Sequence, residues 1–107
     1  MANGIKSYQL LFNASTATSG TWFNLDPRYA AENTRTIQYS MNAADSLKVE
    51  VTTYPNVNDG VFSASDYITL TTLTGATSGS YNIVGAWQWV RITKVGIAGN
   101  AKVQGII

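Results

Sequence analysis

The sequence predicts an all-β fold, an antiparallel β-sandwich of jelly-roll or immunoglobulin-like type with about seven or eight short strands. Apolar and polar residues alternate with period two in several separate segments, as they do in half-buried strands. Clusters of Asn, Asp, Gly, Ser and Thr separate these segments, and little of the chain has the longer period of an amphipathic helix. The 107 residues are expected to form a single domain, residues 1–107, long enough to bury one hydrophobic core.

Four strands are expected in the first half of the chain. Residues 6–12, 35–41 and 47–52 each alternate between apolar and polar side chains, which separates a core face from a solvent face. Residues 21–25 form a shorter strand, which ends at Asp26-Pro27 because proline has no backbone N–H to donate. The segment that follows, residues 26–33, could form one helical turn, but we expect a loop across one end of the sandwich.

The second half of the chain contains the remaining strands. Residues 67–74 are rich in threonine and other β-branched residues, and residues 80–84 form a shorter strand. Residues 86–95 and 101–107 form a β-hairpin at the end of the sequence. Turn-forming clusters lie between the strands at residues 13–20, 42–45, 56–60 and 74–79.

The alternating segments also predict which side chains form the core. Residues two apart in a strand point to the same face of the sheet, so the apolar row of each segment turns inward. The predicted core contains Tyr8, Leu10, Phe12, Ile37, Tyr39, Met41, Leu47, Val49, Val51, Ile68, Leu70, Val90 and Ile92.

The composition favours assembly with other proteins over binding to nucleic acid or to a membrane. Charged residues make up 12% of the chain, about half the usual share, and the formal net charge is +1, so charge repulsion opposes association only weakly. The seven basic residues are scattered among six acids and form no stripe for phosphates. No apolar run is long enough to cross a bilayer, and the N-terminus does not resemble a signal peptide.

The sequence does not favour an enzyme or a protein that needs a metal or cofactor. It contains no cysteine and no histidine, so thiolate ligands, a cysteine nucleophile and the usual general base are missing. No spacing pairs two of the six acids for glycoside hydrolysis. Residues 56–60, Asn-Val-Asn-Asp-Gly, faintly resemble a calcium loop, but they have one charged residue, and we expect a turn at Asp59-Gly60.

The candidate binding residues are Trp87, Trp89 and Arg91. If Val90 and Ile92 face the core, these three side chains form a row on the other face of the same strand. Such a row could stack on sugar rings or contact a neighbouring subunit. The alternative is that the strand is central and covered on both faces, by the opposite sheet and by the loop at residues 26–33.

The chain resembles small structural proteins of tailed bacteriophages, most of all the capsid decoration or cement proteins. The resemblance lies in the Thr-, Ser- and Asn-rich strands, the absence of Cys and His, and the ending AWQWVRITKVGIAGNAKVQGII. Within that ending, an aromatic-x-aromatic-Val-Arg-Ile pattern precedes a glycine-containing turn. The family has no catalytic residues to transfer to this chain, and its capsid contacts vary too much to assign by position.

The resemblance implies a role on the outside of a phage head, where the protein would hold capsomers together after synthesis in the host cytoplasm. Its partners would be the major capsid protein or other virion subunits, and it would be a homo-oligomer, often a trimer. Bound subunits stabilise a shell by mass action. Two alternatives stay open: a tail or head-completion protein, and a monomeric carbohydrate-binding module that uses exposed tryptophans.

Overall fold

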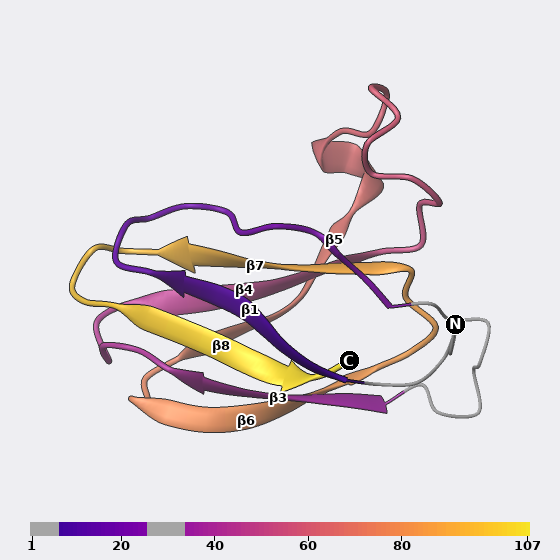
Figure 1. Ribbon diagram of the computed structural model, residues 1–107. Coiled ribbons are helices and arrows are strands. Elements are labelled where there is room, and N and C mark those ends of the chain that lie inside the picture. The colour runs from indigo at the N-terminus through magenta and orange to yellow at the C-terminus, as the bar shows by residue number, and fades with distance from the viewer. Residues whose placement is uncertain (1–6, 26–33) are drawn as a thin grey trace.

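The computed structural model describes residues 7–25 and 34–107, which form a sandwich of two four-stranded antiparallel sheets (Figure 1). Sheet A contains, in spatial order, β1 (Tyr8–Ala14), β8 (Ala101–Ile106), β3 (Thr34–Ser40) and β6 (Ser78–Val84). Sheet B contains β2 (Phe23–Asn24), β7 (Trp89–Val95), β4 (Ser46–Thr52) and β5 (Ile68–Thr74). The predicted all-β sandwich is confirmed, while the loop expected at residues 26–33 lies outside the described residues.

The strand pairing is that of a jelly roll. Strand β1 pairs with β8, β2 with β7, β3 with β6, and β4 with β5, so the chain forms an antiparallel ribbon of four successive strand pairs. The ribbon is wound so that the pairs alternate between the sheets, and the contacts β3–β8 and β4–β7 complete each sheet. Of the two sandwich types predicted, this topology matches the jelly roll.

The core lies between the sheets and contains most of the residues predicted for it. Phe12, Ile37, Met41, Leu47, Val49, Val51, Val90 and Ile92 are buried. Tyr39 and Leu70 are half-buried and pack against the buried cluster. The prediction was wrong for three residues, Tyr8, Leu10 and Ile68, which are exposed.

A β-bulge in β1 explains the exposure of Tyr8 and Leu10. Leu10 pairs with Gln104 and Phe12 with Val103, so Leu11 is an extra residue without its own partner in β8. Because the bulge breaks the period of two, Leu11 and Phe12 both turn inward, and Tyr8 and Leu10 fall on the solvent face of sheet A.

A second irregularity lies in β5, close to the exposed Ile68. Val49 pairs with Thr71 but Glu50 pairs with Thr69, so Leu70 is the extra residue. Beyond this point Ile68 pairs with the buried Val51 and so shares its face, but Ile68 stands at the first position of an edge strand and is 51% exposed. The buried residue of β5 is Leu73, which pairs with Leu47 and was not predicted.

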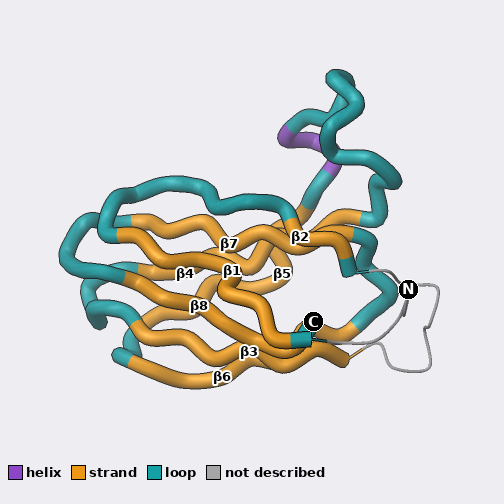
Figure 2. Tube along the Cα trace, in the orientation of Figure 1, coloured by secondary structure: helices purple, strands orange, loops and turns teal. Residues whose placement is uncertain are grey.

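The connection between β4 and β5 stands out from the body of the sandwich. Figure 2 shows residues 53–67 as a long projecting loop that contains one short 3-10 turn, η2 (Ala64–Asp66). In the described part of the chain, no helix has the length and apolar character needed to cross a membrane.

Candidate functional site

Trp87 does not share a strand row with Trp89 and Arg91, which corrects the predicted three-residue stripe. Strand β7 begins at Trp89, and Trp87 lies before it in the bend that follows β6. Its indole Nε1 donates to the carbonyl of Val84 at 3.0 Å, and its ring packs partly against the core. The bend depends on Gly85, whose φ of +125° favours glycine and where a Cβ would lie 2.7 Å from Nε1 of Trp87.

Trp89 and Arg91 do lie on the outer face of β7, but other parts of the chain contact both. The Trp89 Nε1 donates to the carbonyl of Pro55 at 3.3 Å. The Arg91 Nε donates to Oε1 of Glu50 at 2.8 Å, and the Arg91 guanidinium carbon lies 4.6 Å from the ring centroid of Trp22. Arg91 is thus held between a carboxylate and an aromatic ring, an arrangement that stabilises a cation.

Four aromatic side chains, Trp22, Tyr54, Phe62 and Tyr67, form an aromatic cluster over this face of sheet B. The centroid of Trp22 lies 5.4 Å from those of both Phe62 and Tyr67, and Tyr54 lies 5.2 Å from Phe62. Three of the four belong to the projecting loop, so the cluster fastens this loop to the sheet. The strand is therefore central and covered on both faces, and the outer cover is the loop at 53–67, while the predicted cover, residues 26–33, lies outside the described residues.

All three tryptophans of the chain are half-buried, and internal contacts involve each of them. The side chains predicted to bind a partner thus form contacts within the molecule that hold its loops and strands together. That Trp87, Trp89 or Arg91 also contacts a partner stays a prediction.

Residues 56–60 form a turn that is organised by the carboxylate of Asp59. Its Oδ2 accepts the Tyr54 hydroxyl at 2.6 Å, and its Oδ1 accepts the backbone N–H groups of Val61 at 2.8 Å and Phe62 at 3.0 Å. The Tyr54 hydrogen bond, followed by the one from Val61, holds the pKa of Asp59 below its ordinary value, and the carboxylate raises the pKa of Tyr54. Gly60 follows with a φ of +82°.

The other three carboxylates of the described chain also accept structural hydrogen bonds. Glu50 accepts from Arg91 and, at 2.6 Å, from the hydroxyl of Thr93, while Asp66 accepts the N–H of Ser63 at 2.9 Å. Asp45 forms a buried ion pair with Lys94. Residues 7–25 and 34–107 contain no group of three or more acids that could hold a metal ion.

The buried Asp45–Lys94 pair was missed in the sequence, although one signal was present. Lys94 follows Val90 and Ile92 on the inward row of β7, a position where an unpaired charge would be costly. Asp45 accepts the N–H of Ala98 at 2.9 Å and that of Gly99 at 3.1 Å. The Ala98 bond is the largest effect that lowers the pKa of Asp45, and the bonds from Lys94 and Gly99 add to it against the opposing effect of burial.

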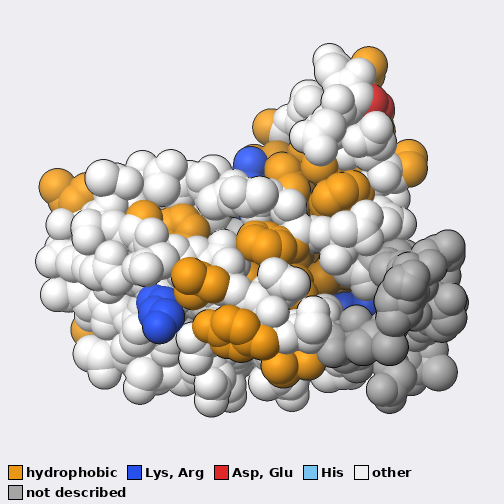
Figure 3. All heavy atoms as spheres, viewed as in Figure 1, with side chains coloured by type: hydrophobic (Ala, Val, Ile, Leu, Met, Phe, Trp, Pro, Cys, Tyr) orange, Lys and Arg blue, Asp and Glu red, His pale blue; other side chains and the backbone are white. Residues whose placement is uncertain are grey.

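The outer face of sheet A has no cover from the other described elements, in contrast to the outer face of sheet B. Strand registers place fourteen side chains on it: Tyr8, Leu10, Asn13, Thr34, Thr36, Gln38, Ser40, Ser78, Ser80, Asn82, Val84, Lys102, Gln104 and Ile106. Lys102 is the one charged residue of this set, and four members are exposed apolar side chains: Tyr8, Leu10, Val84 and Ile106. Figure 3 shows the part of this face over β1 and β8, where orange apolar groups lie among white neutral ones.

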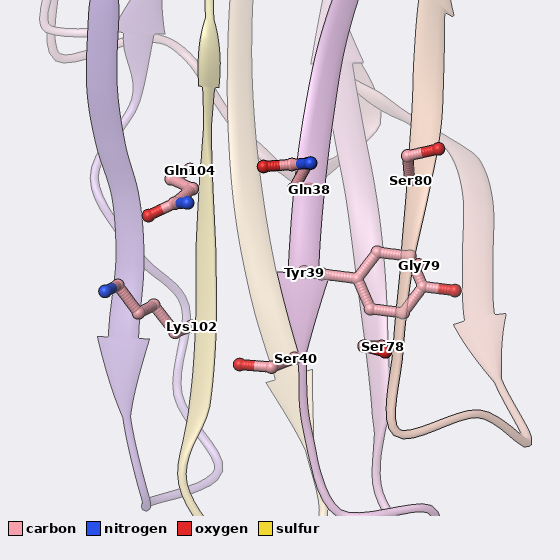
Figure 4. A pocket seen from close by; sticks show the side chains of 8 residues that line it. All are labelled: Gln38, Tyr39, Ser40, Ser78, Gly79, Ser80, Lys102 and Gln104. Atoms are coloured by element: carbon pink, nitrogen blue, oxygen red, sulfur yellow. The ribbon is translucent and has the colours of Figure 1, made fainter.

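Two adjoining hollows lie on this outer face. The larger, of about 530 Å³, is lined by polar side chains of β3, β6 and β8, including Gln38, Ser80 and Gln104 (Figure 4). The Tyr39 ring crosses Gly79 at its wall, where a Cβ would lie 2.7 Å from the tyrosine hydroxyl oxygen. The second hollow, of about 320 Å³, shares Gln38, Ser80 and Gln104 and extends to Tyr8. This face was missed because Tyr8 and Leu10 were assigned to the core.

The sequence matches no protein-family model, and no curated protein shows significant similarity to it. Its function must therefore be inferred from its own residues and their geometry.

Proposed function

We propose that this protein is a non-enzymatic structural subunit that binds other protein subunits through the outer face of sheet A. The observation that carries the proposal is the character of that face, which combines neutral amides and hydroxyls with four exposed apolar side chains and a single lysine. Charged residues are depleted from the centres of protein interfaces because their desolvation is costly, whereas contiguous apolar groups mark binding surfaces.

The surroundings of the acidic residues support a structural role over catalysis. Asp45, Glu50, Asp59 and Asp66 each accept hydrogen bonds that hold a turn, a loop or a neighbouring strand. A carboxylate with such partners is poorly placed to exchange protons with a substrate, because it would have to leave them.

The finer proposal is that the subunit decorates a phage capsid, with the major capsid protein as its partner. The resemblance of the chain to capsid decoration proteins supports this assignment. A sheet face of low charge is suited to lie against a shell of repeated subunits, and each bound copy stabilises the assembled state by mass action.

A carbohydrate-binding module is the second candidate, favoured by one observation on the same face. Tyr8 is 58% exposed and borders the hollow lined by Thr36, Gln38 and Gln104. An aromatic ring beside amide and hydroxyl groups can stack on a sugar and hydrogen-bond to its hydroxyls.

Co-sedimentation tests the proposal. A tagged copy is produced in the cells or infected culture from which the gene comes, and large particles are separated on a density gradient. The wild type should travel with a particle, whereas the variant Leu10→Glu/Ile106→Glu should remain with free proteins at an unchanged melting temperature. The matched control is Ile68→Glu, which adds a carboxylate at an exposed isoleucine of sheet B and should still travel with the particle.

Two results would overturn the proposal. One is a folded wild type that never travels with a particle. The other is equal co-sedimentation of the wild type and the Leu10→Glu/Ile106→Glu variant. A shift of intrinsic fluorescence on titration with soluble oligosaccharides, without particle binding, would support the carbohydrate-binding candidate.

A further inference from the structure

The two open sheets of this sandwich have four edge strands: β1 and β6 in sheet A, β2 and β5 in sheet B. An edge strand directs unpaired N–H and C=O groups outward and can pair with a strand of another chain. Proteins prevent such pairing with bulges, short strands, charged side chains or prolines. The way in which each edge is protected therefore indicates where pairing is permitted.

Three of the four edges carry such a feature. Strand β1 has the bulge at Leu11, and β5 has the bulge at Leu70. Strand β2 is two residues long, and the chain before it touches β7 through an isolated bridge between Ser19 and Thr93. Neither bulged strand offers a straight row of backbone groups, and β2 is too short to do so.

Strand β6 carries none of these features. It has seven residues, Ser-Gly-Ser-Tyr-Asn-Ile-Val, and pairs with β3 at every position without a shift of register. It contains no charged residue and no proline, and the whole segment 67–90 around it is uncharged. Among the described strands, β6 is thus the one regular, neutral edge.

We infer that β6 pairs antiparallel with β6 of a second copy of this chain, across a two-fold axis, so that the two A sheets join into one continuous sheet. When a strand pairs with its own copy, any charged side chain lies near the same charge on the second copy. Strand β6 has no charged side chain, so this repulsion does not arise. The inference does not rest on the proposed function, because it uses the edge of sheet A and leaves its outer face open.

The side-chain order of β6 suits pairing centred on Tyr81. On the inward row, Tyr81 then lies opposite Tyr81 of the second copy, and Gly79 lies opposite Ile83 of the second copy. On the outward row, Ser80 lies opposite Asn82 of the second copy. Aromatic pairs and hydroxyl–amide pairs both stabilise antiparallel strands. The pairing is two-fold, whereas the resemblance to decoration proteins implies a trimer.

Analytical ultracentrifugation over a concentration series tests the pairing. The wild type should sediment at twice the 11.5 kDa mass of one chain. The variant Ser80→Lys/Asn82→Lys places four ammonium groups next to one another across the two-fold axis, so it should sediment as a monomer. The matched control Thr72→Lys/Thr74→Lys adds the same charges at exposed positions of the β5 edge and should remain a dimer.

A cysteine cross-link tests the register. The chain has no cysteine, so Tyr81→Cys introduces a single thiol. Directly opposed residues in antiparallel strands lie about 4.5–5.5 Å apart at Cα, a distance that a disulfide spans. Mild oxidation should give a covalent dimer of Tyr81→Cys, while Thr72→Cys on β5 should stay monomeric on a non-reducing gel.

A wild type that is monomeric at all concentrations would overturn the inference, as would a trimer or a dimer that survives Ser80→Lys/Asn82→Lys. A monomer that still travels with a particle would overturn the pairing and leave the proposed function standing. If β6 instead accepts an extended segment of another protein, the isolated chain would be a monomer and the inference would also fail.

Discussion

The ammonium group of Lys94 lies 3.1 Å from Oδ2 of Asp45, and both side chains are withdrawn from solvent. Lys94 also donates to the carbonyl of Ser15 at 3.2 Å, and Asp45 accepts the N–H groups of Ala98 and Gly99. The pair thus joins three connections at one end of the sandwich: the turn before β4, the loop after β1 and the turn between β7 and β8.

Breaking this pair should destabilise the fold strongly. Asp45→Asn keeps the shape of the side chain but leaves the buried Lys94 without its counter-charge, and an uncompensated buried charge is among the most destabilising changes known. We expect the melting temperature to fall by about 10 °C or more, measured by circular dichroism. Lys102→Met is the control, because Lys102 lies on the exposed outer face of sheet A.

The double variant Asp45→Asn/Lys94→Met should recover part of that loss, because it removes both charges. If Asp45→Asn melts no lower than Lys102→Met, the pair does not hold the end of the sandwich together.

Stability should fall in acid partly because of Asp59. A carboxyl whose pKa is lowered by folding adds stability above its ordinary pKa of about 4, and this stability is lost as the pH falls through the folded pKa. The Tyr54 hydroxyl is the largest cause of the lowered pKa of Asp59. Tyr54→Phe should therefore flatten the decline of melting temperature below about pH 4, although Asp45 will maintain part of it.

The hydrogen bond between Tyr54 and Asp59 also predicts a loss of stability at high pH. Because Asp59 raises the pKa of Tyr54, the stability from the protonated phenol is present below about pH 10 and is lost as the pH rises through the folded pKa. Tyr54→Phe should remove this contribution as well. Identical melting profiles of wild type and Tyr54→Phe at both extremes would contradict the assignment.

Replacing Arg91 should loosen the projecting loop. The guanidinium lies 4.6 Å from the Trp22 centroid and 4.8 Å from the Tyr67 centroid and also pairs with Glu50. Arg91→Met would leave Glu50 without its ion-pair partner and should lower the free energy of unfolding by about 2 kcal/mol or more. Limited proteolysis should then cut within residues 53–67 faster than in the wild type.

Arg91→Lys separates charge from shape, because lysine keeps the charge but lacks the planar group that stacks on a ring. It should lie between the wild type and Arg91→Met in stability. A proteolysis rate at residues 53–67 that neither variant changes would show that the loop is held without Arg91.

Trp89→Ala tests the binding role predicted for this residue from the sequence. A tryptophan that anchors a partner would weaken association by about 2 kcal/mol or more when truncated, without changing the melting temperature. The geometry favours the opposite result, because the Trp89 indole bonds to Pro55 and lies on the sheet opposite the proposed interface. We expect a lower melting temperature and unchanged co-sedimentation. The reverse outcome would restore Trp89 as a contact residue.

The local sequence was sufficient to predict strands wherever period two is unbroken. Residues 35–41 and 47–51 alternate without interruption, and Ile37, Leu47 and Val49 are fully buried as expected. The same rule failed at Tyr8 and Leu10, because both precede a bulge, and at Ile68, because it stands at the first position of the edge strand β5. A bulge arises from the register between two strands, and that register is not encoded in the alternation of either strand alone.

The sequence by itself determined the all-β class, most of the core and the neutral character of the surface, because these follow from side-chain types and their spacing. Tertiary structure alone decided which face is open. Arg91 and Glu50 are 41 positions apart, and Trp89 and Pro55 are 34 apart, yet these contacts turn the tryptophan row into a covered face. The winding of the ribbon brings segments together that are distant in the sequence. The uncovered surface, which is the outer face of sheet A with its β6 edge, can therefore be located only when the pairing of all the described strands is known.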